Sequence, residues 1–129
     1  MIFKSFEFKK IEVKKYNFYL FYGENEGLKK EIINNNFKKI FKNNTYNYEE
    51  SLILQNQKNF FDEILTKSFF ETEKLIIISE TSNKIINLIE ELIEKKLQDI
   101  YIILLANKLD KKSKLRSFFE KDKKLICVP

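Results

Sequence analysis

The chain has 129 residues, of which 43% are hydrophobic and 33% are charged, and its formal net charge is +5. This length and apolar content suit one domain with a core, and no apolar run approaches the roughly 18 residues that a membrane span needs. Histidine is absent and Cys127 is the only cysteine, which excludes His-based triads, His metal sites, and a disulfide framework or cysteine zinc site within the chain.

Strand-like and helix-like patterns alternate along the chain. The opening residues 1–13 fit an edge strand. Beyond them, aromatic or β-branched runs predict strands, and apolar residues at helical spacing predict helices. In chain order these are strand 17–23, helix 24–40, strand 43–49, helix 56–68, strand 74–79, helix 82–98, strand 100–106, helix 112–122 and strand 124–128. Cys127 falls in the last apolar run, which predicts a core residue rather than a nucleophile.

The order of these elements predicts the fold class. Strands 74–79 and 100–106 are apolar throughout, as is typical of strands that are buried on both faces. Strands that alternate with helices, joined by right-handed crossovers, predict a three-layer α/β/α sandwich with a five-stranded, mostly parallel sheet. Such folds bind ligands beyond the carboxyl ends of the strands. Here that edge lies near Gly23, Ser79 and Asn107.

Polar residues that commonly cap helices stand before three of the predicted helices: Asn56 or Asn59, Ser82, and Asn107 or Asp110. The last two belong to the stretch N-K-L-D, which also matches the N-K-x-D guanine-recognition motif of GTPases. In that motif Asp110 would read the guanine edge. Four matching residues are weak evidence in a chain rich in lysine and asparagine. Since guanine recognition would also need a phosphate-binding loop, we interpret these two residues as the start of a helix.

The first strand–turn–helix, "LFYGENEGLKKEI" at 20–32, stands where a phosphate-binding loop would read G-x-x-x-x-G-K-[ST]. Counted from Gly23, only the lysine position is filled as required, by Lys29. Gly27 comes one place early, and Lys30 replaces the hydroxyl that would hold magnesium. Two glutamates in the loop would repel phosphates. The sequence therefore predicts a P-loop-like fold with a degenerate nucleotide site and no catalytic residue, cofactor or metal; a divergent ATPase or GTPase is the alternative.

The positive charge is carried almost entirely by lysine, with Arg116 the only arginine. Proteins that read DNA grooves favour arginine for its bidentate geometry, and scattered lysines attract phosphates weakly and in a salt-sensitive way. We therefore expect weak or indirect contact with DNA. We expect no contact with a membrane, and the single cysteine indicates a reducing, cytoplasmic location.

Three stretches resemble the N-terminal domain of the delta subunit of the bacterial DNA polymerase III clamp loader: "YLFYGENEGLKKEI" (19–32), "SFFETEKLIIIS" (68–79) and "IYIILLANKLDKKSKLRSFFEK" (100–121). The resemblance covers essentially the whole chain. It implies an AAA+-type module that neither binds nor hydrolyses ATP and belongs to the polymerase holoenzyme by complex membership. Family members are longer, so residues 1–129 would correspond to the first domain. The lid and collar domains, through which the subunit meets other loader subunits, would be absent.

The resemblance also implies which residues act. In the family this subunit grips the sliding clamp (beta) and opens the ring, through a hydrophobic pair at the end of the helix before the third strand. The matching positions here are Phe69 and Phe70, with Leu65 and Ser68 beside them. The family often has leucine at the first position of the pair, so Phe69 is a departure that keeps the apolar character.

Helical geometry bears on whether this pair is exposed. At about 100° per residue, the apolar residues within 60–65 share one face, Phe69 lies at its edge, and Phe70 points roughly 150° away from its centre. If the helix continues to residue 70, at least one phenylalanine faces water. If it ends near Ser68, both project from a turn. The competing interpretation is that the chain folds back and Phe70 covers the start of the third strand. The resemblance favours the exposed pair.

Overall fold

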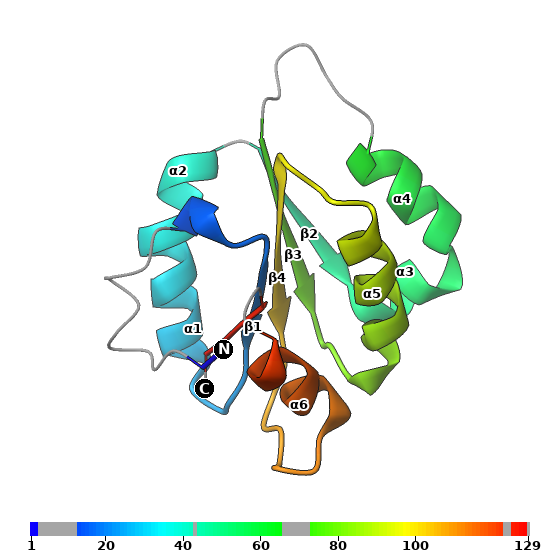
Figure 1. Ribbon diagram of the computed structural model, residues 1–129. Helices are drawn as coiled ribbons and strands as arrows, with labels where there is room; N and C mark the ends of the chain where they lie inside the picture. Colours follow the sequence, from blue (N-terminus) through cyan, green and yellow to red (C-terminus); the bar gives the residue numbers. More distant parts are fainter. Residues whose placement is uncertain (3–12, 43, 66–72, 123–124, 129) are drawn as a thin grey trace.

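A computed structural model of the chain describes residues 1–2, 13–42, 44–65, 73–122 and 125–128 (Figure 1). One five-stranded sheet forms its centre, in the order β2-β3-β4-β1-β5. Its strands are β1 (Phe18–Phe21), β2 (Thr45–Glu49), β3 (Lys74–Ser79), β4 (Ile100–Leu105) and β5 (Leu125–Val128). All neighbouring strands run parallel. The predicted α/β fold is confirmed, with a sheet that is parallel throughout rather than mostly parallel.

Helices cover both faces of the sheet, which gives three layers (Figure 1). One face is covered by η2 (Val13–Lys15), α1 (Glu26–Ile33), the π-helical turn η3 (Asn34–Lys38) and α2 (Lys39–Phe41). The other is covered by α3 (Glu50–Gln55), α4 (Gln57–Leu65), η4 (Asn83–Ile85), α5 (Ile86–Glu94) and α6 (Lys114–Lys121). No helix among the described residues has the length and apolar character needed to cross a bilayer.

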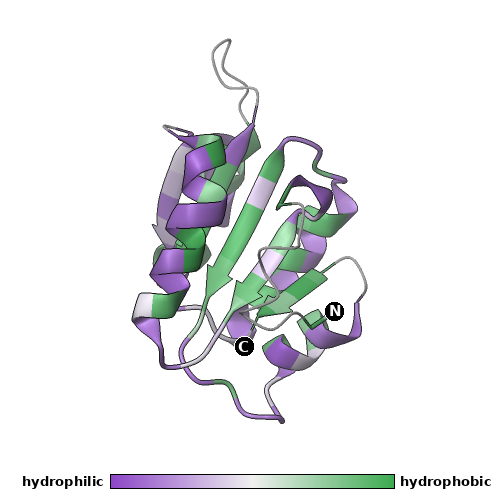
Figure 2. Cartoon of the chain, turned by 90° about the vertical axis from the view of Figure 1, so that its left-hand side faces the viewer, coloured by the Kyte–Doolittle hydropathy of each residue, from purple (hydrophilic) through white to green (hydrophobic). Residues whose placement is uncertain are grey.

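The sheet separates two apolar cores because successive side chains of a strand point to opposite faces. In β1, Leu20 packs on the side of α3 to α6, whereas Tyr19 and Phe21 pack on the side of α1. Figure 2 shows strands that are hydrophobic along most of their length and helices with hydrophilic stretches. Cys127 is fully buried in β5, and burial raises the pKa of its thiol to about 12. The prediction that it is a core residue is confirmed.

One helix of the structure was not predicted, and one predicted strand lies mostly outside the described residues. The helix predicted at 56–68 is preceded by a separate helix, α3, whose six residues are too few to show a helical period in the sequence. Its first residue, Glu50, is buried and its carboxylate accepts hydrogen bonds from the backbone N–H and the hydroxyl of Ser82. At the N-terminus, Ile2 forms an isolated parallel bridge with Cys127; residues 3–12 of the predicted edge strand lie outside the described residues.

The predicted helix caps are confirmed in two of three cases. Asn56 accepts a hydrogen bond from the N–H three residues later (3.1 Å), and Ser82 accepts one from the N–H two residues later (3.3 Å). The prediction that Asn107 or Asp110 caps the helix after β4 is wrong, because Ser113 caps α6. The carboxylate of Asp110 instead accepts from the N–H two residues later (2.9 Å), which closes a turn before the helix begins.

Candidate functional site

The carboxyl ends of β1 and β4, which are neighbours in the sheet, form the edge at which a ligand was predicted. The chain leaves β1 towards α1 on one face and leaves β4 towards α6 on the other, so the two loops diverge here. The N–H of Gly23 donates to the carbonyl of Asn107 (3.1 Å), which brings two of the predicted residues together. Ser79 ends β3, and its hydroxyl donates towards β2, to the carbonyl of Tyr48 (3.3 Å).

Three backbone N–H groups between β1 and the first turn of α1 donate to acceptors within the same loop. The loop turns through Gly23, whose φ of +118° is rarely adopted by residues with a side chain. Asn25 caps α1, since its side-chain oxygen accepts from the N–H of Leu28 (3.0 Å) and its carbonyl accepts from the N–H of Lys29 (3.2 Å). The N–H of Glu26 donates within the loop as well. In a phosphate-binding loop, N–H groups at these positions would face the anion.

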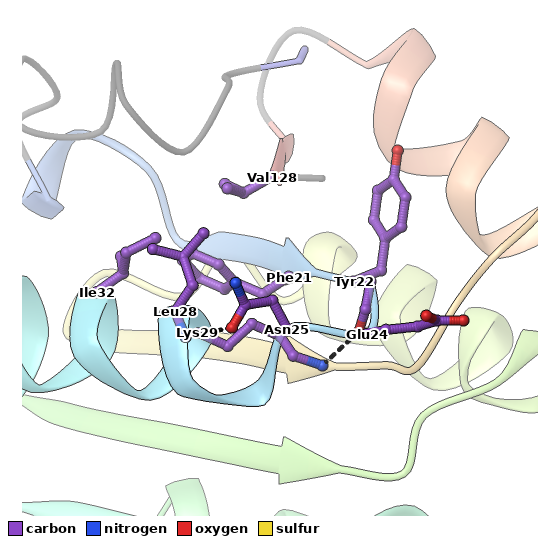
Figure 3. A pocket seen from close by; sticks show the side chains of 9 residues that line it. Phe21, Tyr22, Glu24, Asn25, Leu28, Lys29, Ile32 and Val128 are labelled. Carbon is purple, nitrogen blue, oxygen red and sulfur yellow. Dashed lines mark hydrogen bonds between the residues drawn. The ribbon is translucent and has the colours of Figure 1, made fainter.

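Lys29 occupies the position of the phosphate-binding lysine but is directed into the protein (Figure 3). Its side chain is buried, and its Nζ donates to Oε1 of Glu26 (2.6 Å), to the carbonyl of Gly23 (2.9 Å) and to the carbonyl of Ala106 (3.0 Å). An ammonium group has three protons to donate. All three are therefore used, and the lysine joins the loops after β1 and β4 to each other.

A pocket of about 100 Å³ lies beside this loop. Small-molecule sites usually enclose roughly 300–1,000 Å³. The lining of the pocket beside Lys29 is largely apolar, with Leu28 and Ile32 contributed by α1 and Val128 by β5 (Figure 3). Among the described residues, no three His, Cys, Asp or Glu side chains gather as a metal ion would require. The pocket is therefore smaller than the sites that usually hold small molecules, and most of its lining is apolar.

Arg116 of α6 binds the loop after β4 from the face of the sheet opposite to α1. This role was not predicted from the sequence. The Arg116 guanidinium lies over the ring of Tyr22 (5.2 Å to the centroid), donates to Glu120 (2.6 Å), and donates to the carbonyl of Leu109 (3.1 Å). Burial raises the pKa of the Tyr22 hydroxyl to about 12, so the tyrosine is neutral. That Arg116 is the only arginine of the chain was the one available signal.

Leu65 is the one predicted clamp-contact residue within the described part of the chain; Ser68, Phe69 and Phe70 lie outside it. Leu65 ends α4 and is 38% exposed, whereas Phe60 and Ile64, which were predicted to share its face, are each 2% exposed. The core-facing stripe of α4 thus ends one residue before the helix does. Leu65 presents apolar surface to solvent where the chain leaves α4.

The family of the chain is indicated by a family model described as DNA polymerase III, delta subunit, which matches residues 19–128. The matched residues include β2 to β5, all of β1 except Phe18, and the helices between the strands. No curated protein and no solved structure matches the chain.

Proposed function

Because the chain belongs to the family of DNA polymerase III delta subunits, we propose that it binds the sliding clamp (beta) and helps to open the ring during DNA replication. It is a delta subunit domain of the clamp loader. The observation that carries the proposal is the family match, which extends from β1 through β5.

The domain acts without catalysis in this proposal. Lys29 supports that part, because its three protons are donated within the protein and none is left for a phosphate. The hydroxyl that would hold magnesium in a phosphate-binding loop is replaced by Lys30. Hydrolysis of ATP by the loader then falls to other subunits. This domain contributes binding energy.

The clamp contact consists of Leu65, Ser68, Phe69 and Phe70. Each large apolar side chain that enters a pocket of the partner contributes roughly 1.5–3 kcal/mol, and two adjacent aromatic residues are enough to form the hot spot of a small interface. The exposure of Leu65 supports this assignment, because it places an apolar side chain in solvent next to the segment. Ring opening follows if the domain binds the open clamp more tightly than the closed one.

The test is binding of the cognate clamp by the wild-type chain and by the double variant Phe69→Ala/Phe70→Ala, measured by surface plasmon resonance. We expect the double variant to lose binding while its melting temperature barely changes. Leu52→Ala is the matched control, because Leu52 is 62% exposed on α3, and it should bind normally. A large drop in the melting temperature of the double variant would instead identify the pair as core and contradict the proposal.

Ring opening needs its own assay, since binding alone does not demonstrate it. A clamp that carries a fluorophore pair across one subunit interface reports separation of the two subunits. We expect the wild-type chain to lower energy transfer and the double variant to leave it unchanged. Equal energy transfer with the wild-type chain and with buffer would restrict the function to binding.

A divergent ATPase or GTPase is the alternative function, and a nucleotide titration separates the two. With magnesium present, ATP and GTP should produce no heat of binding and no thermal stabilisation up to millimolar concentration. Magnesium-dependent binding at micromolar concentration would refute the conclusion drawn from Lys29 and restore the alternative.

The proposed setting is the cytoplasmic replication machinery. The partners are the clamp and the other loader subunits, with DNA contacted weakly or indirectly. Lysines in the described residues supply a salt-sensitive attraction to phosphates, and Arg116, the only arginine, is held by Glu120 and Leu109.

A further inference from the structure

Five exposed lysines from two separate segments gather at the carboxyl end of the sheet. Four lie between the end of β4 and the first residue of α6, and the fifth lies in η4, which follows β3. Because β3 and β4 are parallel neighbours, the segments that leave them meet at one end of the molecule, at the bottom of Figure 1. We call these residues the edge lysines: Lys84, Lys108, Lys111, Lys112 and Lys114.

Hydrogen bonds fix the backbone that carries the edge lysines. The side-chain oxygen of Asn83 in η4 accepts from the N–H of Leu115 in α6 (2.9 Å), which joins the two segments. Within the loop, the carboxylate of Asp110 accepts from the N–H of Lys112 (2.9 Å), and Arg116 holds the loop from α6. A surface whose backbone is already ordered loses less conformational freedom when it binds a partner.

The edge lysines contribute no contact to the fold. None of them forms a salt bridge or donates a side-chain hydrogen bond to a described residue. The same loops carry the carboxylates of Glu80 and Asp110, and neither lies within salt-bridge distance of a described lysine. Lys114 stands in the first turn of α6, where the helix dipole disfavours positive charge. These charges are therefore available to an anionic partner.

The composition of this surface favours the backbone of duplex DNA as that partner. Every exposed residue within 107–114 is polar, whereas protein interfaces centre on apolar or aromatic anchors and are depleted in lysine. Single strands are held by stacking on aromatic side chains; residues 107–114 include none, and Tyr22 is buried beneath Arg116. Because Arg116 is held within the protein, the surface has no arginine with which to read bases.

We propose that the edge lysines contact the phosphate backbone of duplex DNA without reading its sequence. The inference rests on the proposed function, which places the domain beside DNA. The C-terminal end of α4, which carries Leu65, lies at the opposite end of the sheet (Figure 1), so the clamp and DNA do not compete for one surface. Each lysine that meets a phosphate adds about 0.9 to the slope of log affinity against log salt concentration.

Fluorescence anisotropy of a labelled duplex tests the proposal, with affinity measured between about 50 and 200 mM salt. Lys111→Gln/Lys112→Gln should make the slope shallower by about 2 and weaken binding roughly 10- to 50-fold at about 0.1 M salt. Lys38→Gln/Lys39→Gln is the matched control, because it removes the same charge from two adjacent exposed lysines of η3 and α2, at the other end of the molecule (Figure 1). It should change the slope by less than about 0.5.

Two results of this assay would overturn the proposal. Equal effects of the two double variants would mean that the attraction is spread over the whole surface of the chain. No binding of the duplex by the wild type at the lowest salt concentration would mean that the edge lysines do not hold DNA.

Competition identifies the class of partner. Unlabelled duplex should displace the labelled duplex at a lower concentration than single-stranded DNA or polyglutamate that carries the same number of charges. Better displacement by the single strand would refute the duplex as partner. Better displacement by polyglutamate would indicate an acidic protein surface and refute DNA.

The outcomes also distinguish this inference from the function on which it rests. Lys111→Gln/Lys112→Gln should bind the clamp as the wild type does, and Phe69→Ala/Phe70→Ala should bind the duplex as the wild type does. An unchanged salt slope in the lysine variant refutes the DNA contact and leaves clamp binding intact. Wild-type clamp affinity in the phenylalanine variant refutes the clamp contact, and the DNA contact is then judged by its own salt slope.

Discussion

Replacement of Lys29 by methionine should open the connection between the loops after β1 and β4. Methionine keeps an apolar stem of similar length but donates no hydrogen bond. Glu26 is 61% exposed and regains water at little cost. The carbonyls of Gly23 and Ala106 lose a charged donor, and each buried acceptor left without a partner costs about 1–3 kcal/mol. We therefore expect the free energy of unfolding to fall by about 2–4 kcal/mol.

Urea unfolding followed by circular dichroism measures this loss, provided that the slope against urea is the same for both proteins. In a chain of this size, the melting temperature should fall by about 6–12 °C. Glu26→Gln is the control and should change stability by less than about 1 kcal/mol, because that carboxylate is mostly solvated. A loss below about 1 kcal/mol in Lys29→Met, or a gain, would refute the inference that this lysine holds the two loops together.

Three further predictions concern the same sheet edge and its supports. Gly23→Ala should lower the free energy of unfolding, measured in urea, by about 1–3 kcal/mol, because φ is +118° and a Cβ there would meet no atom that could offset the strain. Gly27→Ala lies in a helix with room for a Cβ, and it should raise the free energy of unfolding by about 0.4–1 kcal/mol. Burial raises the pKa of the Cys127 thiol from 9.0 to about 12, so the stabilisation by the neutral thiol is complete below pH 9 and is lost as the pH rises towards 12. Between pH 8 and 10, the free energy of unfolding of the wild type should therefore fall by about 1.4 kcal/mol more than that of Cys127→Val. Parallel curves of unfolding free energy against pH for the two proteins would contradict this. Asn83→Ala should cost about 1 kcal/mol by thermal unfolding, because its side-chain oxygen accepts from the N–H of Leu115 in the first turn of α6 (2.9 Å); an unchanged melting temperature would mean that Ser113 is a sufficient cap.

Elements whose pattern is local could be predicted from the sequence. The strands at 74–79 and 100–106 are apolar throughout because helices cover both faces of the sheet, and that requirement is visible in the residues themselves. Helix α3 could not be predicted, since its six residues carry no period and its N-terminal residue, Glu50, is held by Ser82 from beyond the next strand.

The contacts of the candidate site are mostly long-range, which is why the sequence did not reveal them. Counting from Gly23 showed that Lys29 stands at the lysine position of a degenerate loop. Its third acceptor, Ala106, is 77 residues away and is brought near only by the pairing of β1 with β4. The cap of α6 was misassigned to Asn107 or Asp110 for a related reason. Several residues just before a helix can each form a turn or a cap, and the sequence does not show which of them will cap the helix. In the structure Ser113 occupies the N-cap position of α6.

The strand order determines when this chain can fold as it leaves the ribosome. Strands β2 and β3 are neighbours in both sequence and space, but β1 pairs with β4 and β5. Strand β1 therefore has no partner strand until residues 100–105 have been translated. Lys29 likewise lacks its third acceptor until residue 106 has been translated. Until then the apolar residues of β1 have no sheet to enter, which exposes the nascent chain to aggregation. Translation must pass β4 before the centre of this sheet can close.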